Sequence, residues 1–110
     1  MIEKIILDYL NDKAPVPAYM EKPETEPTQY ILIEKTVSGR ANHIDSATIA
    51  LQSYADSLFD AASLNEKVKA IMYDIDELDE VFSVRLVRDY NFTDTTKKKY
   101  RYQAIFDLVF

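Results

Sequence analysis

The stretch that decides the fold is residues 100–110, Tyr100-Arg101-Tyr102-Gln103-Ala104-Ile105-Phe106-Asp107-Leu108-Val109-Phe110. Apolar and aromatic side chains alternate along it, which is typical of a strand with one buried face. The expected buried face carries Tyr100, Tyr102, Ala104, Phe106, Leu108 and Phe110, and the other carries Arg101, Gln103, Ile105, Asp107 and Val109. The strand is about twice the common length of ~5–6 residues. A strand this long must be paired, covered or used by a partner, because an open edge invites association.

The regions before this strand show the periodicities of an α+β domain. Apolar residues recur at helical spacing in about 2–11 and about 56–78, so we expect a short N-terminal helix and a long one. The expected strands are 28–36, 44–54, 81–90 and 99–110. This order predicts a single domain, 1–110, with a mostly antiparallel sheet of about four to five strands. We expect the long helix to pack on one face and a long C-terminal β-hairpin to close the chain.

The connecting segments have their own signals. All four prolines lie within 13–27, where residues 16–20 fit a short edge strand because Pro has no N–H to donate. Ser38-Gly39 predicts a turn inside a polar loop at 37–43. Residues 91–98 are expected to form a polar hairpin loop.

The long helix has two possible start signals. Ser57 is followed three residues later by Asp60, and Ser63 is followed by Glu66, which is the better capping box. The helix is therefore expected either to begin at 57 or to have a break near 63.

Composition excludes several classes of function. A net charge of −6 and a pI of about 4.7 argue against generic binding to nucleic-acid phosphates, which depends on Lys and Arg. The absence of Cys excludes disulfides, thiolate catalysis and Cys-ligated zinc. One glycine, Gly39, cannot build a glycine-rich phosphate loop. The first twelve residues are too short and too charged for a signal peptide or a membrane span.

The sequence offers no recognisable set of catalytic residues. His43 is the only histidine, its neighbours offer no partner for catalysis or metal binding, and no nucleophile elbow is present. We expect His43 to be a loop or strand-edge residue. The prediction is a protein without enzymatic activity, metal or cofactor.

Two charged clusters are candidate contact sites. The acidic cluster is expected to be either the solvated end of a helix or a charged rim facing a partner, and consists of Asp74, Asp76, Glu77, Asp79 and Glu80. Its spacing resembles an EF-hand loop but lacks the required glycine at the sixth position. The basic cluster, Lys97, Lys98 and Lys99, is expected at a hairpin tip. Such a tip either protects the sheet edge or, with the aromatic residues beside it, contacts nucleic acid.

A resemblance covers nearly the whole chain. It is carried by the strand at 28–36, the turn Ser38-Gly39, the strand-to-helix junction at 42–61 and the closing Tyr-Gln strand at 100–107. The junction contains the run Ile44-Asp45-Ser46-Ala47-Thr48-Ile49-Ala50-Leu51-Gln52-Ser53-Tyr54-Ala55. In this order the segments resemble the small tail-terminator and tail-completion proteins of long non-contractile-tailed bacteriophages and prophages.

The resemblance implies a structural role in the virion. Such proteins form a ring, commonly a hexamer, at the head-proximal end of the tail, where they stop tube growth and mediate head–tail joining. The implied partners are further copies of the chain, the tail-tube protein and the head connector or stopper protein. The ring is in some cases formed only on the tail, so a monomer in isolation is compatible with this role. DNA is expected to pass through the ring without specific binding, and no membrane is involved. The chain would be made in the bacterial host cytoplasm.

Two alternatives stay open at this point. The chain resembles the head-completion and stopper connector proteins in size, and a free-standing protein-binding module is also compatible with the pattern. For assembly, the candidate subunit-interface residues are Ile105, Val109, Tyr90 and Phe92. Ile105 and Val109 are too apolar to be left in water on the outward face of the closing strand, so we expect a neighbouring subunit to cover them.

Overall fold

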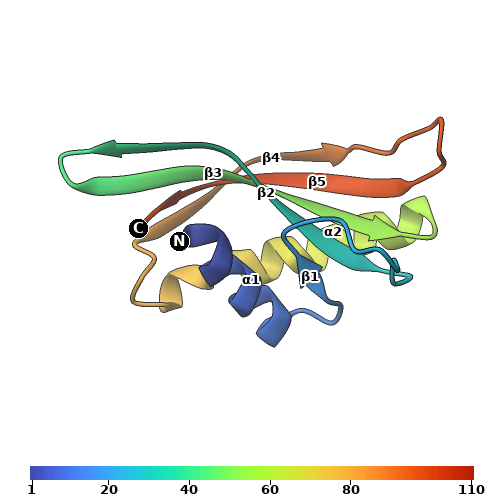
Figure 1. The fold of residues 1–110 in the computed structure, drawn as a ribbon, viewed down its shortest axis with the longest axis horizontal. Helices are drawn as coiled ribbons and strands as arrows, with labels where there is room; N and C mark the ends of the chain where they lie inside the picture. The colour runs from blue at the N-terminus through green and yellow to red at the C-terminus, as the bar shows by residue number, and fades with distance from the viewer.

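The closing strand of the sequence, β5 (Tyr100–Val109), lies inside a five-stranded sheet. The strand order is β1-β2-β3-β5-β4, so β5 is hydrogen-bonded on both sides (Figure 1). β3 pairs with it from Ser46 to Ala55, and β4 pairs with it from Ser83 to Asn91. The long alternating strand is therefore satisfied within the subunit, and other strands form the edges.

The computed structural model describes residues 1–110, which form an elongated body of 44 × 25 × 25 Å. The elements are α1 (Ile2–Lys13), β1 (Ala18–Tyr19), β2 (Tyr30–Ala41), β3 (Ile44–Ala55), α2 (Leu58–Met72), the 3-10 helix η1 (Ile75–Glu77), β4 (Ser83–Asn91) and β5. All strand pairs are antiparallel except β1 with β2. The predicted α+β class, the packed helix and the C-terminal hairpin are confirmed.

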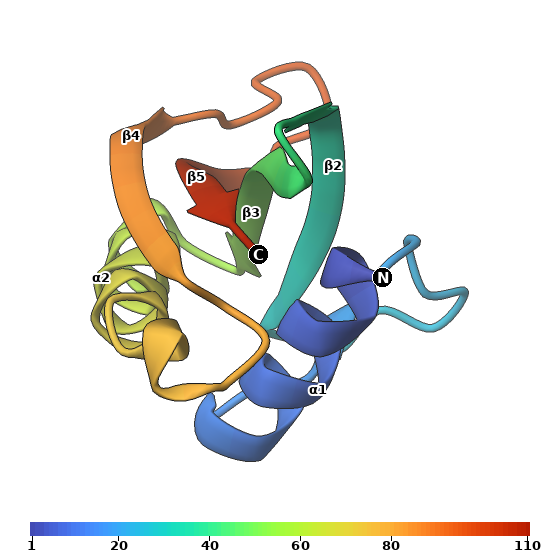
Figure 2. The same ribbon diagram turned by 90° about the vertical axis from the view of Figure 1, so that its left-hand side faces the viewer.

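Both helices lie on one face of the sheet, below it in Figure 1. Figure 2 shows β2 and β4 on opposite sides of the molecule, with β3 and β5 between them. Between helices and sheet lies one apolar core to which α1 contributes Ile6 and Leu10 and α2 contributes Leu64, Val68 and Met72. From the sheet it includes Ile31, Ile33, Ile49, Leu51, Ala104, Phe106 and Leu108. The face of β5 that we expected to be buried does pack against this core, with Tyr100, Tyr102 and Phe110 half-buried at its ends.

The predicted turn at Ser38-Gly39 is wrong. β2 continues through both residues to Ala41, and the chain turns at Asn42 and His43 instead. These two residues have φ angles of 53° and 65°, as a two-residue hairpin turn of the I′ type requires. Asn tolerates this left-handed backbone well, which makes the Asn-His pair a weaker form of the familiar Asn-Gly signal. His43 is exposed at this turn, in agreement with its expected loop position.

The long helix is shorter than the apolar spacing predicts. It begins after Ser57, whose hydroxyl accepts a hydrogen bond from the Asp60 N–H at 3.1 Å, and no break occurs at Ser63. It ends at Met72, and η1 follows. Ile75 is fully buried in the 3-10 turn, so the apolar stripe continues after the α-helix has ended. Residue spacing alone does not separate these two kinds of turn.

Candidate functional site

The face of the sheet that no helix covers is the main candidate surface, and we call it the outer face. Its central positions are nevertheless buried: Ala50, Gln52 and Tyr54 on β3 and Gln103 and Ile105 on β5 are each at most 9% exposed. Residues paired across these two strands share this face, so their side chains cover one another. The polar residues among them need partners within the subunit, and the structure provides them.

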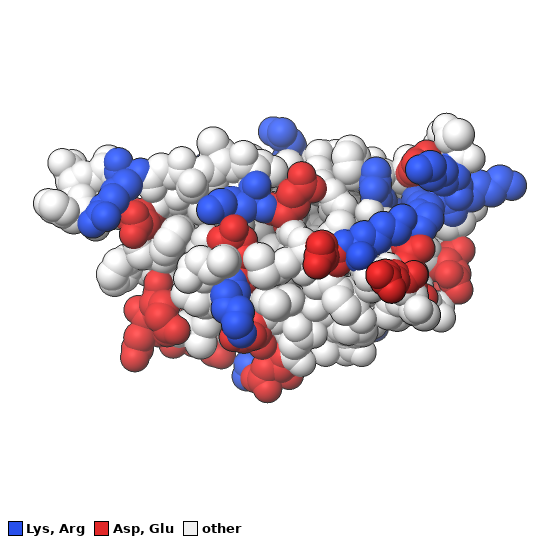
Figure 3. All heavy atoms as spheres, viewed as in Figure 1, with Lys and Arg blue, Asp and Glu red and all other residues white.

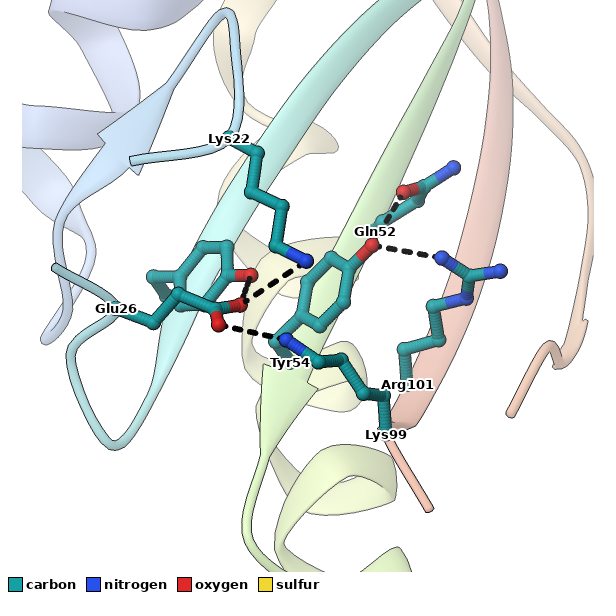
Figure 4. Close-up of polar contacts among 7 residues, drawn as sticks. Lys22, Glu26, Gln52, Tyr54, Lys99 and Arg101 are labelled. Atoms are coloured by element: carbon teal, nitrogen blue, oxygen red, sulfur yellow. Dashed lines mark hydrogen bonds and ion pairs between the residues drawn. The ribbon is translucent and has the colours of Figure 1, made fainter. Parts of the chain in front are cut away.

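An aromatic row crosses this face at one end of the sheet. The Tyr30 and Tyr54 rings are stacked with centroids 4.6 Å apart, and Tyr19 meets Tyr30 edge-on at 6.0 Å. The Arg101 guanidinium lies 4.4 Å from the centre of the Phe92 ring and donates a hydrogen bond of 2.7 Å to the Tyr54 hydroxyl (Figure 4). The row thus connects β1, β2, β3 and β5 to the residue that follows β4. Sequence reasoning missed it because its members are far apart in the chain.

A polar row lies beside it. The Gln52 amide donates to the Gln103 side-chain carbonyl at 2.9 Å, and the Gln103 amide donates to the Tyr90 hydroxyl. The Tyr54 hydroxyl donates to the Gln52 side-chain carbonyl at 3.2 Å. The two buried glutamines are therefore satisfied, as buried amides must be if they are not to destabilise the fold. Tyr90, one of the predicted interface residues, is engaged in this row and half-buried.

The other predicted interface residues are placed as follows. Ile105 lies on the outer face as expected, but it is only 9% exposed in a single subunit. Its register neighbours are Ala50 on one side and Arg88 on the other. The single subunit therefore already keeps Ile105 largely out of water, and its assignment to a subunit contact stays a prediction. Val109 is half-buried and Phe92 is 37% exposed, so for these two the interface stays a prediction.

The basic hairpin tip adjoins a cleft of about 360 Å³ between the β4–β5 loop and the segment before β2. The Lys99 ammonium is 2.6 Å from the Glu26 carboxylate, and the Tyr30 hydroxyl donates to the same carboxylate at 2.6 Å. Lys22 adds a longer ion pair to Glu26 at 3.7 Å (Figure 4). Glu26 neutralises Lys99, which lies 73 residues away in the sequence, whereas Lys97 and Lys98 remain exposed.

These contacts shift the ionisation of the cleft residues. Hydrogen bonds from Lys99 and then from Tyr30 hold the pKa of Glu26 below its ordinary value. The carboxylate in turn raises the pKa of Lys99. Burial, followed by the hydrogen bond to Glu26, raises the pKa of Tyr30 well above its usual range. Around Glu26 the charges are paired, whereas Lys97, Lys98 and Asp56, which also line the cleft, form no ion pair.

The acidic cluster lies at the opposite, helical side of the molecule. Asp74, Asp76, Glu77, Asp79 and Glu80 are all exposed, in and around η1. The nearest cation is Lys13 of α1, whose ammonium is 3.9 Å from the Glu77 carboxylate. Figure 3 shows Lys and Arg gathered at the hairpin-tip end with Asp and Glu among them, and further Asp and Glu along the lower, helical side. No three His, Asp or Glu side chains converge in a way that could hold a metal ion.

Two stretches of strand backbone are open for pairing. β4 has β5 on one side and no strand on the other. β1 pairs with β2 only at Ile31 and Leu32, so residues 33–41 of β2 have no strand on that side either. Each open stretch contains one register irregularity, between Leu86 and Arg88 in β4 and between Lys35 and Val37 in β2. Such bulges strengthen local twist and limit indiscriminate pairing.

No family model matches the chain, and no curated protein matches its sequence. None of its helices combines the length and apolar character needed to cross a membrane.

Proposed function

We propose that the chain is a structural subunit of a bacteriophage or prophage tail, a tail-terminator or tail-completion protein. It forms a ring at the head-proximal end of the tail and joins the tail to the head connector. We base the choice of a phage tail on the resemblance of the sequence to tail-terminator and tail-completion proteins. The single structural observation that supports it is the pair of open sheet edges on opposite sides of one molecule (Figure 2).

Open edges on opposite sides favour contacts between unlike surfaces of successive copies. A contact between two different surfaces repeats from one subunit to the next, and it closes into a ring when the rotation per subunit divides a full turn. A contact of one surface with itself would stop at a dimer. Main-chain pairing along such edges is a common source of affinity between chains.

The charge distribution is compatible with a DNA passage. Five of the acidic residues lie together on the helical side, and the chain carries a net charge of −6. An acidic lining repels phosphates, so DNA would slide through without being held. A ring structure with a basic lumen would contradict this part of the proposal.

The test is assembly state together with gene position. Sedimentation velocity over a concentration series and negative-stain electron microscopy should show rings, either alone or on the ends of tail tubes. The gene should lie just upstream of a major tail protein gene. A chain that stays monomeric with and without tubes, encoded in a metabolic operon, would contradict the proposal.

A further inference from the structure

The two open edges of the sheet match each other in length and direction. β4 and the open part of β2, residues 33–41, contain the same number of residues. β2, β3, β5 and β4 reverse direction at each step across the sheet, so β4 runs opposite to β2. A second copy placed beside β4 in the same orientation therefore presents its β2 antiparallel to β4.

When the two edges are aligned end to end, the bulge of β4 lies opposite the bulge of β2. With Ser83 opposite Ala41, Val87 lies opposite Val37, and both valines stand at the bulges. These valines are 37% and 60% exposed in the single subunit, so pairing of the two edges would cover apolar surface. A bulge increases the local twist of its strand, and this alignment places the two bulges opposite one another.

The same alignment keeps the faces of the sheet consistent. On one side of the bulges, Arg85 lies opposite Gly39, and both belong to the outer face by their register with β5 and β3. On the other side of the bulges, Tyr90 lies opposite Glu34, and these two again belong to the outer face. A shift by one residue would place every side chain on the wrong face.

At its other end the alignment is limited by β1. Asp89 falls opposite Lys35, but each already has an ion-pair partner in its own subunit, Lys69 at 2.9 Å and Glu3 at 3.4 Å, so the contact between copies rests on strand pairing and register. β1 occupies Ile31 and Leu32, which stops an incoming strand at residue 33.

We infer that β4 of one copy pairs antiparallel with residues 33–41 of the next copy, with Ser83 opposite Ala41, so that one sheet continues from subunit to subunit. This inference rests on the proposed ring-forming function and specifies its subunit contact. The open edge of β4 is thus covered by β2 of a second copy, and the open edge of β2 is covered by β4 of a further copy.

Disulfide trapping tests the register, and the natural chain contains no Cys to interfere. Single variants are mixed in pairs under mild oxidation: Val87→Cys with Val37→Cys, and Ser83→Cys with Ala41→Cys. Each matched mixture should give a linked band at twice the subunit mass. The crossed mixtures, Ser83→Cys with Val37→Cys and Val87→Cys with Ala41→Cys, are out of register by four residues, roughly 13 Å at ~3.3 Å per residue. They should give none, because a disulfide needs Cβ atoms ~3.5–4.5 Å apart.

Light scattering on the same samples distinguishes failure of the inferred strand pairing from failure of the proposed ring assembly. Lys67→Cys, on the exposed side of α2, replaces the β4 variants as a matched control and should not link to either β2 variant. Circular dichroism confirms that each variant is folded. Assembly without matched links, or self-linking of Val87→Cys through a two-fold contact, overturns the inference and leaves the proposed function standing. Absence of assembly at any concentration, with and without tail tubes, overturns both.

Discussion

Replacing Ile105 by Ala tests whether the outer face is covered within one subunit. The substitution removes three carbon groups, each worth about 0.8 kcal/mol when buried. Because Ile105 is 9% exposed, the expected loss in the free energy of unfolding is about 2 kcal/mol. Little is added for a cavity, since no helix closes this face and water can enter the space.

Two matched variants bracket this value. Ile49→Ala, at a fully buried position facing the helices, should cost about 3–4 kcal/mol because a closed cavity adds to the transfer free energy. Val37→Ala, at a position that is 60% exposed, should cost about 0.5 kcal/mol or less. Urea unfolding followed by circular dichroism, with the slope of the transition compared between variants, measures all three.

The order of the three losses decides the question. If Ile105→Ala costs no more than Val37→Ala, the outer face is open to water in the single subunit and the reasoning from burial is refuted. If the predicted order holds, Ile105→Glu should destabilise the subunit as well, because it places a carboxylate at a position only 9% exposed, even though Arg88 lies opposite on β4. Loss of assembly in that variant would then say nothing about the subunit interface.

Three further predictions concern local contacts. Glu26→Gln should make the free energy of unfolding less dependent on pH in acid. The pKa of Glu26 is lower in the folded protein than its ordinary value of 4.5, so its carboxylate stabilises the fold above pH 4.5, and this stabilisation is lost as the pH falls through the folded pKa. The stabilities of wild type and variant should therefore converge in acid. Urea midpoints of both proteins, measured at about pH 3 to about pH 7, test the convergence. A difference between the two proteins that is the same at low and at neutral pH would contradict the prediction. Arg101→Met should lower the free energy of unfolding by about 1–2 kcal/mol, because it removes hydrogen bonds to the Tyr54 hydroxyl and the Phe92 carbonyl. The control Arg88→Met, at an exposed position of β4, should lower it by less than about 0.5 kcal/mol. Equal losses for the two variants in urea unfolding would contradict a stabilising role of the aromatic row. His43→Gly should raise stability by about 0.5–1 kcal/mol because it relieves a φ of 65°, and a lower thermal midpoint would show that the side chain has a stabilising contact.

Local signals in the sequence predicted the fold well. The alternation in residues 100–110 identifies β5 and its buried face, and of the two start signals for α2 the structure uses Ser57 with Asp60 rather than the better capping box at Ser63. Each of these signals depends on neighbours within a few residues. The turn at Asn42 and His43 was missed because Ser-Gly is the stronger generic turn signal, although a strand tolerates both residues.

What the sequence could not show depends on contacts between distant segments. The pairing of Lys99 with Glu26 becomes visible only when the hairpin tip folds over the segment before β2. The cover of Ile105 likewise comes from strands whose neighbours are not fixed by periodicity. Alternation says that Ile105 lies opposite the helix face, but it does not say how much of that opposite face is left in water.

The position of β5 between β3 and β4 has a consequence for synthesis on the ribosome. β5 leaves the ribosome after β2, β3 and β4, yet it is the strand that joins the β2–β3 hairpin to β4. Until it emerges, one edge of β3 is unpaired, and β4 has no strand to pair with. A nascent chain of this protein therefore exposes unpaired edges of β3 and β4 until β5 has been made, and only then can the five-stranded sheet close.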